Sequence, residues 1–353
     1  MIPFGNPSIS GLSAPLSLAE RKILSTLDDG SDCPVGLSAA TRLIDEYYAI
    51  AGGVSLLTGE RDENFRVKTA TGDGAIFKIF GLSQADEAAD LLAAILTYLE
   101  RTAPHLPVPR LIAGKAGETL RFQDEEGRNR RAIMYSFLPG KPLMDAQRQS
   151  AQYRQCGALL ATLAQALRGF RHPAMHRPLI WDLRNLPALR GLLPSIPDVA
   201  FAPFVHDFLE IFVRDVVGAL AALPHQFVHN DFNARNIIVE ADYEARVSGV
   251  IDFGDALYTA RIADVSVGVI GQLSAPESAD EALEAFAEAY DAITPLEAGE
   301  QALLPWLVAA RIVQNLVMTS WYRSRQPSNG HFVAFNADYF AWRVDFAQRL
   351  ISR

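Results

Sequence analysis

The stretch HNDFNARN, residues 229–236, decides how this chain of 353 residues is interpreted. It follows the apolar run LPHQFV (223–228) directly and places six hydrogen-bonding side chains in eight positions. Buried polar groups have to be paired, because an unpaired group costs on the order of 1–3 kcal/mol. The stretch is therefore either a solvated turn or a site that is built for a polar ligand.

A second polar segment follows at an informative spacing. Asn236 comes five residues after Asp231 and opens the strand-like NIIVE, and the next strand-like segment, VSGVIDFG, carries Asp252 near its end. Because the strands of a hairpin lie side by side, we expect Asp231, Asn236 and Asp252 to converge. Two carboxylates and an amide oxygen suit Mg²⁺ that carries phosphates, and kinases present these groups in the same order. The alternative is a polar turn beside an unrelated strand end.

A kinase-like site also requires a lysine on a strand, and GAIFKIF (74–80) contains Lys78. The alternation of a strand places Ile76, Lys78 and Phe80 on one face. A charge among apolar residues needs a phosphate and an acidic partner. The alternative is a lysine on an edge strand that reaches water.

The loop GERDENF (59–65) is where a kinase would cover the phosphates. It contains only Gly59 and does not match the pattern G-x-G-x-x-G. We expect a polar loop, with Asn64 and Phe65 at its exit, that covers the phosphates through backbone N–H groups. The alternative is an ordinary hairpin turn.

The composition excludes several classes of protein. The formal charge of −9 is spread along the chain without a basic cluster, which argues against a nucleic-acid partner. Cys33 and Cys156 lie far apart and match no metal-binding spacing, so we expect reduced thiols. The start, MIPFGNPSIS, lacks the features of a signal peptide, and no apolar run approaches the length of a membrane span. We therefore expect a cytoplasmic protein with no membrane partner.

The order of strand-like and helical patterns predicts an α+β chain with two lobes. Short β-rich pieces and one amphipathic helix, SQADEAADLLAAILTYLERT, fill residues 52–138 and predict a small nucleotide-binding N-lobe. Residues 139–353 carry mostly helical signals and predict a larger C-lobe. Residues 1–51 are expected to form an N-terminal arm with a helix.

At these residues the chain resembles the aminoglycoside phosphotransferase-like superfamily, and within it the hydroxylysine kinase and homoserine kinase branch. The resemblance rests on HNDFNARN, VIDFGDALYTARIADV, the FKIF strand, the GERDENF loop and the hinge-like YSFLPGKPL, and it runs from about residue 52 to the end. It implies a protein-kinase-like fold of two lobes with the active site in the cleft. It also implies transfer of the terminal phosphoryl group of a nucleotide to a hydroxyl of a small molecule.

The resemblance implies roles for individual residues. Asp231 is the catalytic base that orients the acceptor hydroxyl, and Asn236 and Asp252 hold Mg²⁺. Lys78 pairs with the phosphates of ATP or GTP, while Leu92 stands where the following helix usually has Glu or Gln. Adenine is expected to contact backbone groups of the hinge, namely those of Ser136, Phe137 and Leu138.

The acceptor pocket has weaker signals. Asp182 in IWDLRN and Arg311 in LVAARIVQN are hypotheses for acceptor binding. An arginine within an apolar helix needs a carboxylate, which belongs either to the substrate or to the protein itself. We expect the acceptor to be a small molecule that carries a hydroxyl and an amine.

Three hypotheses for the function stay open at this point. The first is a small-molecule kinase for an amino alcohol or a hydroxy amino acid. The second is an aminoglycoside-type antibiotic phosphotransferase, and the third is a catalytically weak pseudokinase, suggested by Leu92. A protein kinase is excluded, although APE occurs at 275–277, because the glycine-rich loop is missing and the segment between DFG and APE is apolar. We interpret APE as a helix start with Pro276 in its first turn.

Overall fold

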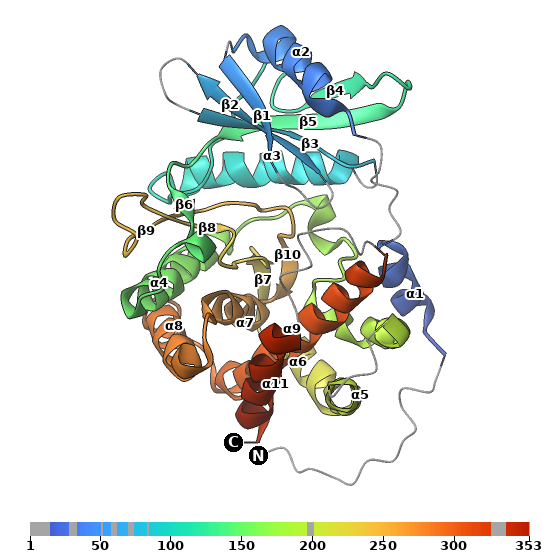
Figure 1. The fold of residues 1–353 in the computed structure, drawn as a ribbon, viewed down its shortest axis with the longest axis vertical. Helices are drawn as coiled ribbons and strands as arrows, with labels where there is room; N and C mark the ends of the chain where they lie inside the picture. The colour runs from blue at the N-terminus through green and yellow to red at the C-terminus, as the bar shows by residue number, and fades with distance from the viewer. Residues whose placement is uncertain are drawn as a thin grey trace.

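The computed structural model describes residues 15–27, 34–50, 52–57, 62–69, 74–82, 85–195, 201–325 and 337–352. A β-rich N-terminal lobe lies above a larger helical lobe (Figure 1). This is the α+β, kinase-like architecture that the sequence predicted. The lobe limits 52–138 and 139–353 stay a proposal. Gly59 and Cys33 lie outside the described residues, whereas Cys156 is buried.

The N-terminal lobe is an antiparallel sheet between two helices (Figure 1). In the part of the chain that the structure describes, its strands have the order β1-β2-β3-β5-β4. They are β1 (Gly52–Leu57), β2 (Glu63–Thr69), β3 (Gly74–Ile79), β4 (Leu120–Gln123) and β5 (Asn129–Ser136). Helix α2 (Gly36–Tyr48) covers one face of the sheet, and α3 (Ala85–Thr102) covers the other.

Alternation along β3 sends neighbouring side chains to opposite faces of the sheet. Phe77 and Ile79 pack in one hydrophobic cluster with residues of α2, whereas Phe80 belongs to the cluster that includes α3. The Lys78 ammonium lies 5.6 Å from the centre of the Phe80 ring, so Lys78 shares that second face. The expected alternation on this strand is therefore confirmed, and it directs Lys78 toward the C-terminal lobe.

The C-terminal lobe consists mainly of packed helices. They are α4 (Ser150–Leu167), α5 (Ala202–Ile211), α6 (Val217–Ala222), α7 (Arg261–Gln272), α8 (Ala279–Ile293), α9 (Ala298–Arg325) and α11 (Ala337–Ile351). A π-helical turn, η4 (Phe212–Val216), lies between α5 and α6, although the apolar helical pattern of the sequence continues from 202 to 223. Pro276 begins the short 3₁₀ helix η5 (Pro276–Ser278) that leads into α8, as expected for the APE segment.

The two helices described before residue 51 contact different lobes. Helix α1 (Leu18–Ser25) packs against η3 (Leu183–Ser195) of the C-terminal lobe, where Glu20 pairs with Arg190 at 2.7 Å. Helix α2 instead covers the N-terminal sheet (Figure 1). The limit of the N-terminal arm at residue 51 stays a proposal.

Two small sheets position the polar segments that the sequence singled out. Strand β8 (Ile237–Val239) pairs with β9 (Val247–Val250), which is the predicted hairpin, and also with β6 (Lys141–Pro142). Strand β7 (His225–Val228) pairs with β10 (Leu257–Ala260). The loop from β7 to β8 and the loop from β9 to β10 therefore connect the same two sheets and lie side by side.

Helix α9 has the length and composition of a membrane span, so the expectation that no apolar run reaches that length is wrong here. It has 28 residues and a mean hydropathy of 1.4 over its most apolar window. However, 78% of that window is buried against the rest of the protein. It has the burial of a core helix, and it packs against α7, α11 and η3.

Candidate active site

The loop after β7 is held by one buried carboxylate. Asn230 adopts a left-handed conformation with φ of 62°, which asparagine tolerates better than most residues. Asp264 of α7 accepts hydrogen bonds from the N–H groups of His229 (3.2 Å) and Asn230 (2.7 Å). Burial raises the pKa of Asp264 to about 7, although these two N–H groups oppose the shift. Asp264 therefore anchors the turn and does not face a ligand.

His229 connects this loop to the strand that carries Asp252. Its Nε2 lies 3.1 Å from the carbonyl oxygen of Ile251, and its Nδ1 accepts the N–H of Asp231 at 3.2 Å. Because a carbonyl only accepts, the proton resides on Nε2 and the ring is neutral. Burial lowers the pKa of His229 to about 4 against the opposing charge of Asp252. The ring is therefore a fixed structural connection between the two loops.

Both oxygens of the Asp231 carboxylate are bound within the same loop. Asn233 donates to Oδ1 at 2.7 Å, and Asn236 donates to Oδ2 at 2.6 Å and to the Asp231 carbonyl at 3.0 Å. Burial, followed by the neighbouring charge of Asp255, raises the pKa of Asp231 well above its usual value, while Arg311 opposes the shift. The side chain keeps 24% of its surface exposed, so a ligand can still reach it.

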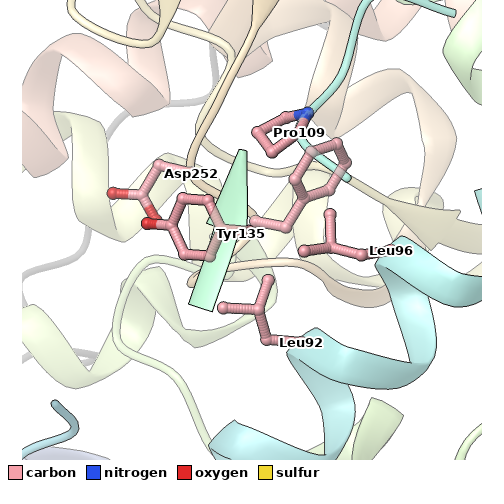
Figure 2. A pocket seen from close by; sticks show the side chains of 6 residues that line it. Leu92, Leu96, Pro109, Tyr135 and Asp252 are labelled. Atoms are coloured by element: carbon pink, nitrogen blue, oxygen red, sulfur yellow. The ribbon is translucent and has the colours of Figure 1, made fainter. Parts of the chain in front are cut away.

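Asp252 occupies the turn after β9. It has a left-handed backbone with φ of 62°, and its Oδ1 accepts the N–H of Gly254 at 3.1 Å. The side chain is 49% exposed and lies 3.9 Å from the Lys78 ammonium. Figure 2 shows its carboxylate beside the Tyr135 hydroxyl, at the border of a small cavity between the lobes. The structure thus brings Lys78 and Asp252 together across the two lobes.

Lys78 has a second carboxylate partner that the sequence analysis missed. Asp62 Oδ2 lies 2.8 Å from the Lys78 ammonium, and Asp62 Oδ1 accepts the N–H of Gly81 at 3.0 Å. Burial lowers the pKa of Lys78, but the charges of Asp62 and Asp252 outweigh burial and raise it overall. The sequence alone gave no signal for this pair, because the register that places Asn64 opposite Lys78, two positions after Asp62, is visible only in the structure.

Phe65, which we expected at the nucleotide, lies in the core of the N-terminal lobe. Its side chain is fully buried in the cluster under α2, and its strand is paired on both edges, with β1 and β3. Neither its ring nor its backbone faces the cleft, so we remove Phe65 from the proposed nucleotide site. Asn64 stays, because it lies beside Lys78 on the neighbouring strand.

The hinge offers fewer free donors than expected. The N–H of Ser136 donates to the Arg110 carbonyl and the N–H of Phe137 to the Gly74 carbonyl, both at 2.8 Å. The Phe137 ring stacks with the Arg66 guanidinium at 3.8 Å. The hinge groups that remain proposed for contact with the nucleobase are therefore the carbonyls of residues 136–138 and the backbone N–H of Leu138.

The two residues suggested for acceptor binding differ in their surroundings. Asp182 is buried, and its carboxylate accepts from the Arg184 guanidinium (2.6 and 2.9 Å) and from the Thr259 hydroxyl (3.0 Å). It joins η3 to β10, so we no longer propose it as an acceptor ligand. Arg311 donates to the Trp181 carbonyl at 3.0 Å and lies 3.8 Å from Asp231 Oδ1. Arg311 therefore lies beside Asp231, and its carboxylate partner is internal.

The donors near the cleft fit a magnesium ion that carries phosphates. Among the described residues no group of three or more His, Cys, Asp or Glu side chains could hold a metal, but such an ion needs only one or two protein carboxylates with phosphates and water. Asn236 turns its amide nitrogen to Asp231, which leaves its amide oxygen on the other side. This oxygen and the half-exposed carboxylate of Asp252 are hard donors of the kind that Mg²⁺ prefers.

Comparisons with known proteins agree with this geometry. The phosphotransferase enzyme family matches residues 54–306, which is more than half of the chain. Hydroxylysine kinase of Mus musculus is 24% identical over 322 residues, covering 84% of this chain and 85% of the mouse protein.

Two solved structures share the fold at low sequence identity. An amicoumacin kinase in complex with AMP-PNP and Ca²⁺ aligns with a TM-score of 0.64 and 14% identity over 94% of this chain and 96% of that protein. A microcompartment-associated aminopropanol kinase aligns with a TM-score of 0.62 and 16% identity over 90% of this chain and 98% of that protein. The kinase-like fold expected from the sequence is confirmed, and the chain belongs to the phosphotransferase enzyme family.

Proposed function

We propose that this protein is a small-molecule kinase that transfers the terminal phosphoryl group of a nucleoside triphosphate to a hydroxyl of an amino alcohol or a hydroxy amino acid. One observation carries the proposal. Asp231, which Asn233 and Asn236 hold, lies in the loop beside Asp252, and Asp252 approaches Lys78. Kinases use these groups in the same order along the chain. The relatives named above act on hydroxylysine, a hydroxy amino acid, and on aminopropanol, an amino alcohol.

Asp231 is the proposed catalytic base. Its carboxylate would accept a hydrogen bond from the acceptor hydroxyl and take its proton as the new P–O bond forms. Asn233 and Asn236 hold both carboxylate oxygens, so the group is oriented before the acceptor arrives. Its raised pKa brings it nearer to neutral pH, where a base is more effective. Phosphoryl transfer has a loose transition state, so this orientation is the main contribution expected from the loop.

The nucleotide would lie between the lobes. Lys78 is proposed to bind the phosphates. The Leu138 backbone and the hinge carbonyls would bind the nucleobase, and Asn64 would border the phosphate site. Asn236 and Asp252 would hold Mg²⁺, which neutralises phosphate charge when bound.

The acceptor is proposed to enter beside Arg311 and Asp231. Arg311 is 5% exposed and its guanidinium lies over the Trp181 ring at 4.8 Å, so it borders this space in a fixed position. An aminoglycoside acceptor is not favoured, because the curated relatives that cover most of this chain are named hydroxylysine kinase. The pseudokinase alternative is weakened by Asp62, which gives Lys78 an acidic partner. A cytoplasmic location is part of the proposal and is supported by the burial of α9.

A panel of acceptors tests the proposal. The purified protein is incubated with Mg²⁺ and either ATP or GTP and with 5-hydroxylysine, 1-amino-2-propanol, homoserine or kanamycin, and products are measured by mass spectrometry. We expect a phosphorylated product with an amino alcohol or a hydroxy amino acid, and none with the Asp231→Asn variant. Turnover with kanamycin alone, or with no acceptor in either nucleotide, would contradict the proposal.

A further inference from the structure

We propose that Asp62, in the loop before β2, is the positioning residue that holds Lys78 against the nucleotide phosphates, in place of the helix glutamate that kinases normally use. The inference rests on the proposed function, because it assigns Lys78 to the phosphates. Protein kinases require an ion pair between the strand lysine and a glutamate of the following helix. Here the carboxylate comes from a different element.

Asp62 is held at two points. One oxygen accepts the N–H of Gly81 at 3.0 Å, just beyond the end of β3, and the other lies 2.8 Å from the Lys78 ammonium. The Gly81 bond fixes the carboxylate independently of the lysine, so the ammonium is oriented by a group that is already in place. Asp252 lies farther away, at 3.9 Å, and is the proposed metal ligand. Among the residues that the structure describes, Asp62 is thus the carboxylate within hydrogen-bond distance of Lys78.

Helix α3 cannot supply this carboxylate. Leu92 occupies the position where the resemblance predicts the helix residue that would pair with the lysine. It lines the same small cavity as Tyr135 and Asp252 (Figure 2). The cavity has a volume of about 10 Å³, so it has no room for more than one water molecule. The helix thus presents an apolar side chain to the lysine region.

Two carboxylates of α3, those of Asp86 and Asp90, have another partner. Asp86 and Asp90 both bind the guanidinium of Arg131 on β5, which is buried, and Asp86 also pairs with Arg121 at 2.9 Å. Their removal would leave the Arg131 cation without its partners. Asp86 and Asp90 are therefore committed to the sheet, whereas the ion pairs of Lys78 are with Asp62 and Asp252.

This arrangement couples Lys78 to a different part of the lobe. In kinases with a helix glutamate, movement of the helix makes or breaks the ion pair. Asp62 instead directly precedes β2 (Glu63–Thr69), so the ion pair that it makes with Lys78 does not involve α3.

A comparison of two isosteric substitutions tests the inference. Asp62→Asn keeps an oxygen that can accept the Gly81 N–H but removes the charge beside Lys78. Asp90→Asn removes a charge of the same lobe that binds Arg131 and serves as the matched control. We expect Asp62→Asn to lower kcat/KM for the nucleotide about tenfold or more and Asp90→Asn to change it less than about twofold. A double variant distinguishes the positioning role of Asp62 from a purely structural one. Leu92→Glu in the Asp62→Asn background places a carboxylate on α3, and we expect it to recover activity.

Three results would overturn the inference. The first is an Asp62→Asn variant that matches the control. The second is tighter nucleotide binding with normal turnover, which would make Asp62 a competitor of the phosphates. The third is a loss of activity in Asp62→Asn, in protein shown to be folded by thermal unfolding, that Leu92→Glu does not restore and that Asp62→Glu shares.

Nucleotide binding separates this inference from the proposed function. A wild-type protein that phosphorylates no acceptor contradicts the function alone. The thermal shift caused by ATP without Mg²⁺ then still tests Asp62, because a smaller shift in Asp62→Asn supports the positioning role and an equal or larger shift overturns it.

Discussion

At the scale of single residues, His229 shows how a buried ring fixes two loops. Its two nitrogens bind the Ile251 carbonyl and the Asp231 N–H, an arrangement that only the neutral ring satisfies. A second proton would have to point at the N–H of Asp231. Burial, which lowers the pKa of the ring to about 4, also favours the neutral form.

This predicts a pH dependence of stability that belongs to His229. Between pH 6.5 and 4 the unfolded chain binds a proton at His229 that the folded protein does not bind. The contribution of the neutral His229 ring to the unfolding free energy is therefore present above pH 6.5 and is lost as the pH falls toward 4. The shift corresponds to about 3 kcal/mol. We expect the difference in unfolding free energy between wild type and His229→Gln to shrink by this order over that range, as measured by denaturant titration.

Asp264 changes with pH in the opposite direction. Its pKa is raised to about 7, so its contribution is greatest at low pH and is lost as the pH rises through 7. It is present in both proteins, so the difference between them isolates His229. A difference that stays constant with pH would contradict the neutral, buried ring.

The reassignment of Asp182 makes a second prediction at this scale. Its carboxylate binds Arg184 and Thr259, which join η3 to β10. Asp182→Asn is expected to lower the unfolding free energy by about 1–3 kcal/mol while acceptor KM changes less than about twofold. Thermal unfolding and steady-state kinetics measure the two effects. A large rise in acceptor KM with unchanged stability would return Asp182 to the acceptor site.

At the scale of elements, α4 and α8 pack closely through a glycine. A Cβ atom on Gly157 of α4 would lie 2.2 Å from the Phe286 carbonyl oxygen of α8. Because that oxygen belongs to the backbone, one of the two helices would have to move. The absence of a side chain at position 157 sets the distance between these helices.

Gly157→Ala is therefore expected to destabilise the protein by about 2 kcal/mol or more. Gly218 in α6 is the matched control, since a Cβ atom there meets nothing within 4 Å. Gly218→Ala should stabilise by up to about 1 kcal/mol, because alanine favours a helix. Chemical denaturation measures the unfolding free energy of both variants. Equal changes in Gly157→Ala and Gly218→Ala would show that the close packing of α4 and α8 is absent.

The elements also show what could be predicted from local pattern. The β8–β9 hairpin and the alternation on β3 follow from residue order and a period of two, so both were found. The π-helical turn at 212–216 was missed because an apolar helical pattern continues through it. The burial of Phe65 in the core was not predicted, because a loop exit and a core strand position look alike without the register.

At the scale of the whole molecule, the site is assembled from segments of both lobes. Lys78 and Asp62 come from the N-terminal sheet, whereas Asp231, Asn236 and Asp252 come from loops between the small sheets below it. Their motif order could be found in the sequence, since kinases share it. Asp62 could not, because its pairing depends on how the loop before β2 lies over β3, which no periodic pattern encodes.

The central claim is that Asp231 does the chemistry at a site where nucleotide binding is carried by other residues. The measurement is kcat together with nucleotide affinity for Asp231→Asn, with Asp242→Asn, an exposed aspartate in the β8–β9 turn, as control. We predict that kcat falls about 100-fold or more in Asp231→Asn while nucleotide Kd stays within about twofold, and that the control keeps wild-type values. Parental turnover in Asp231→Asn would contradict the account.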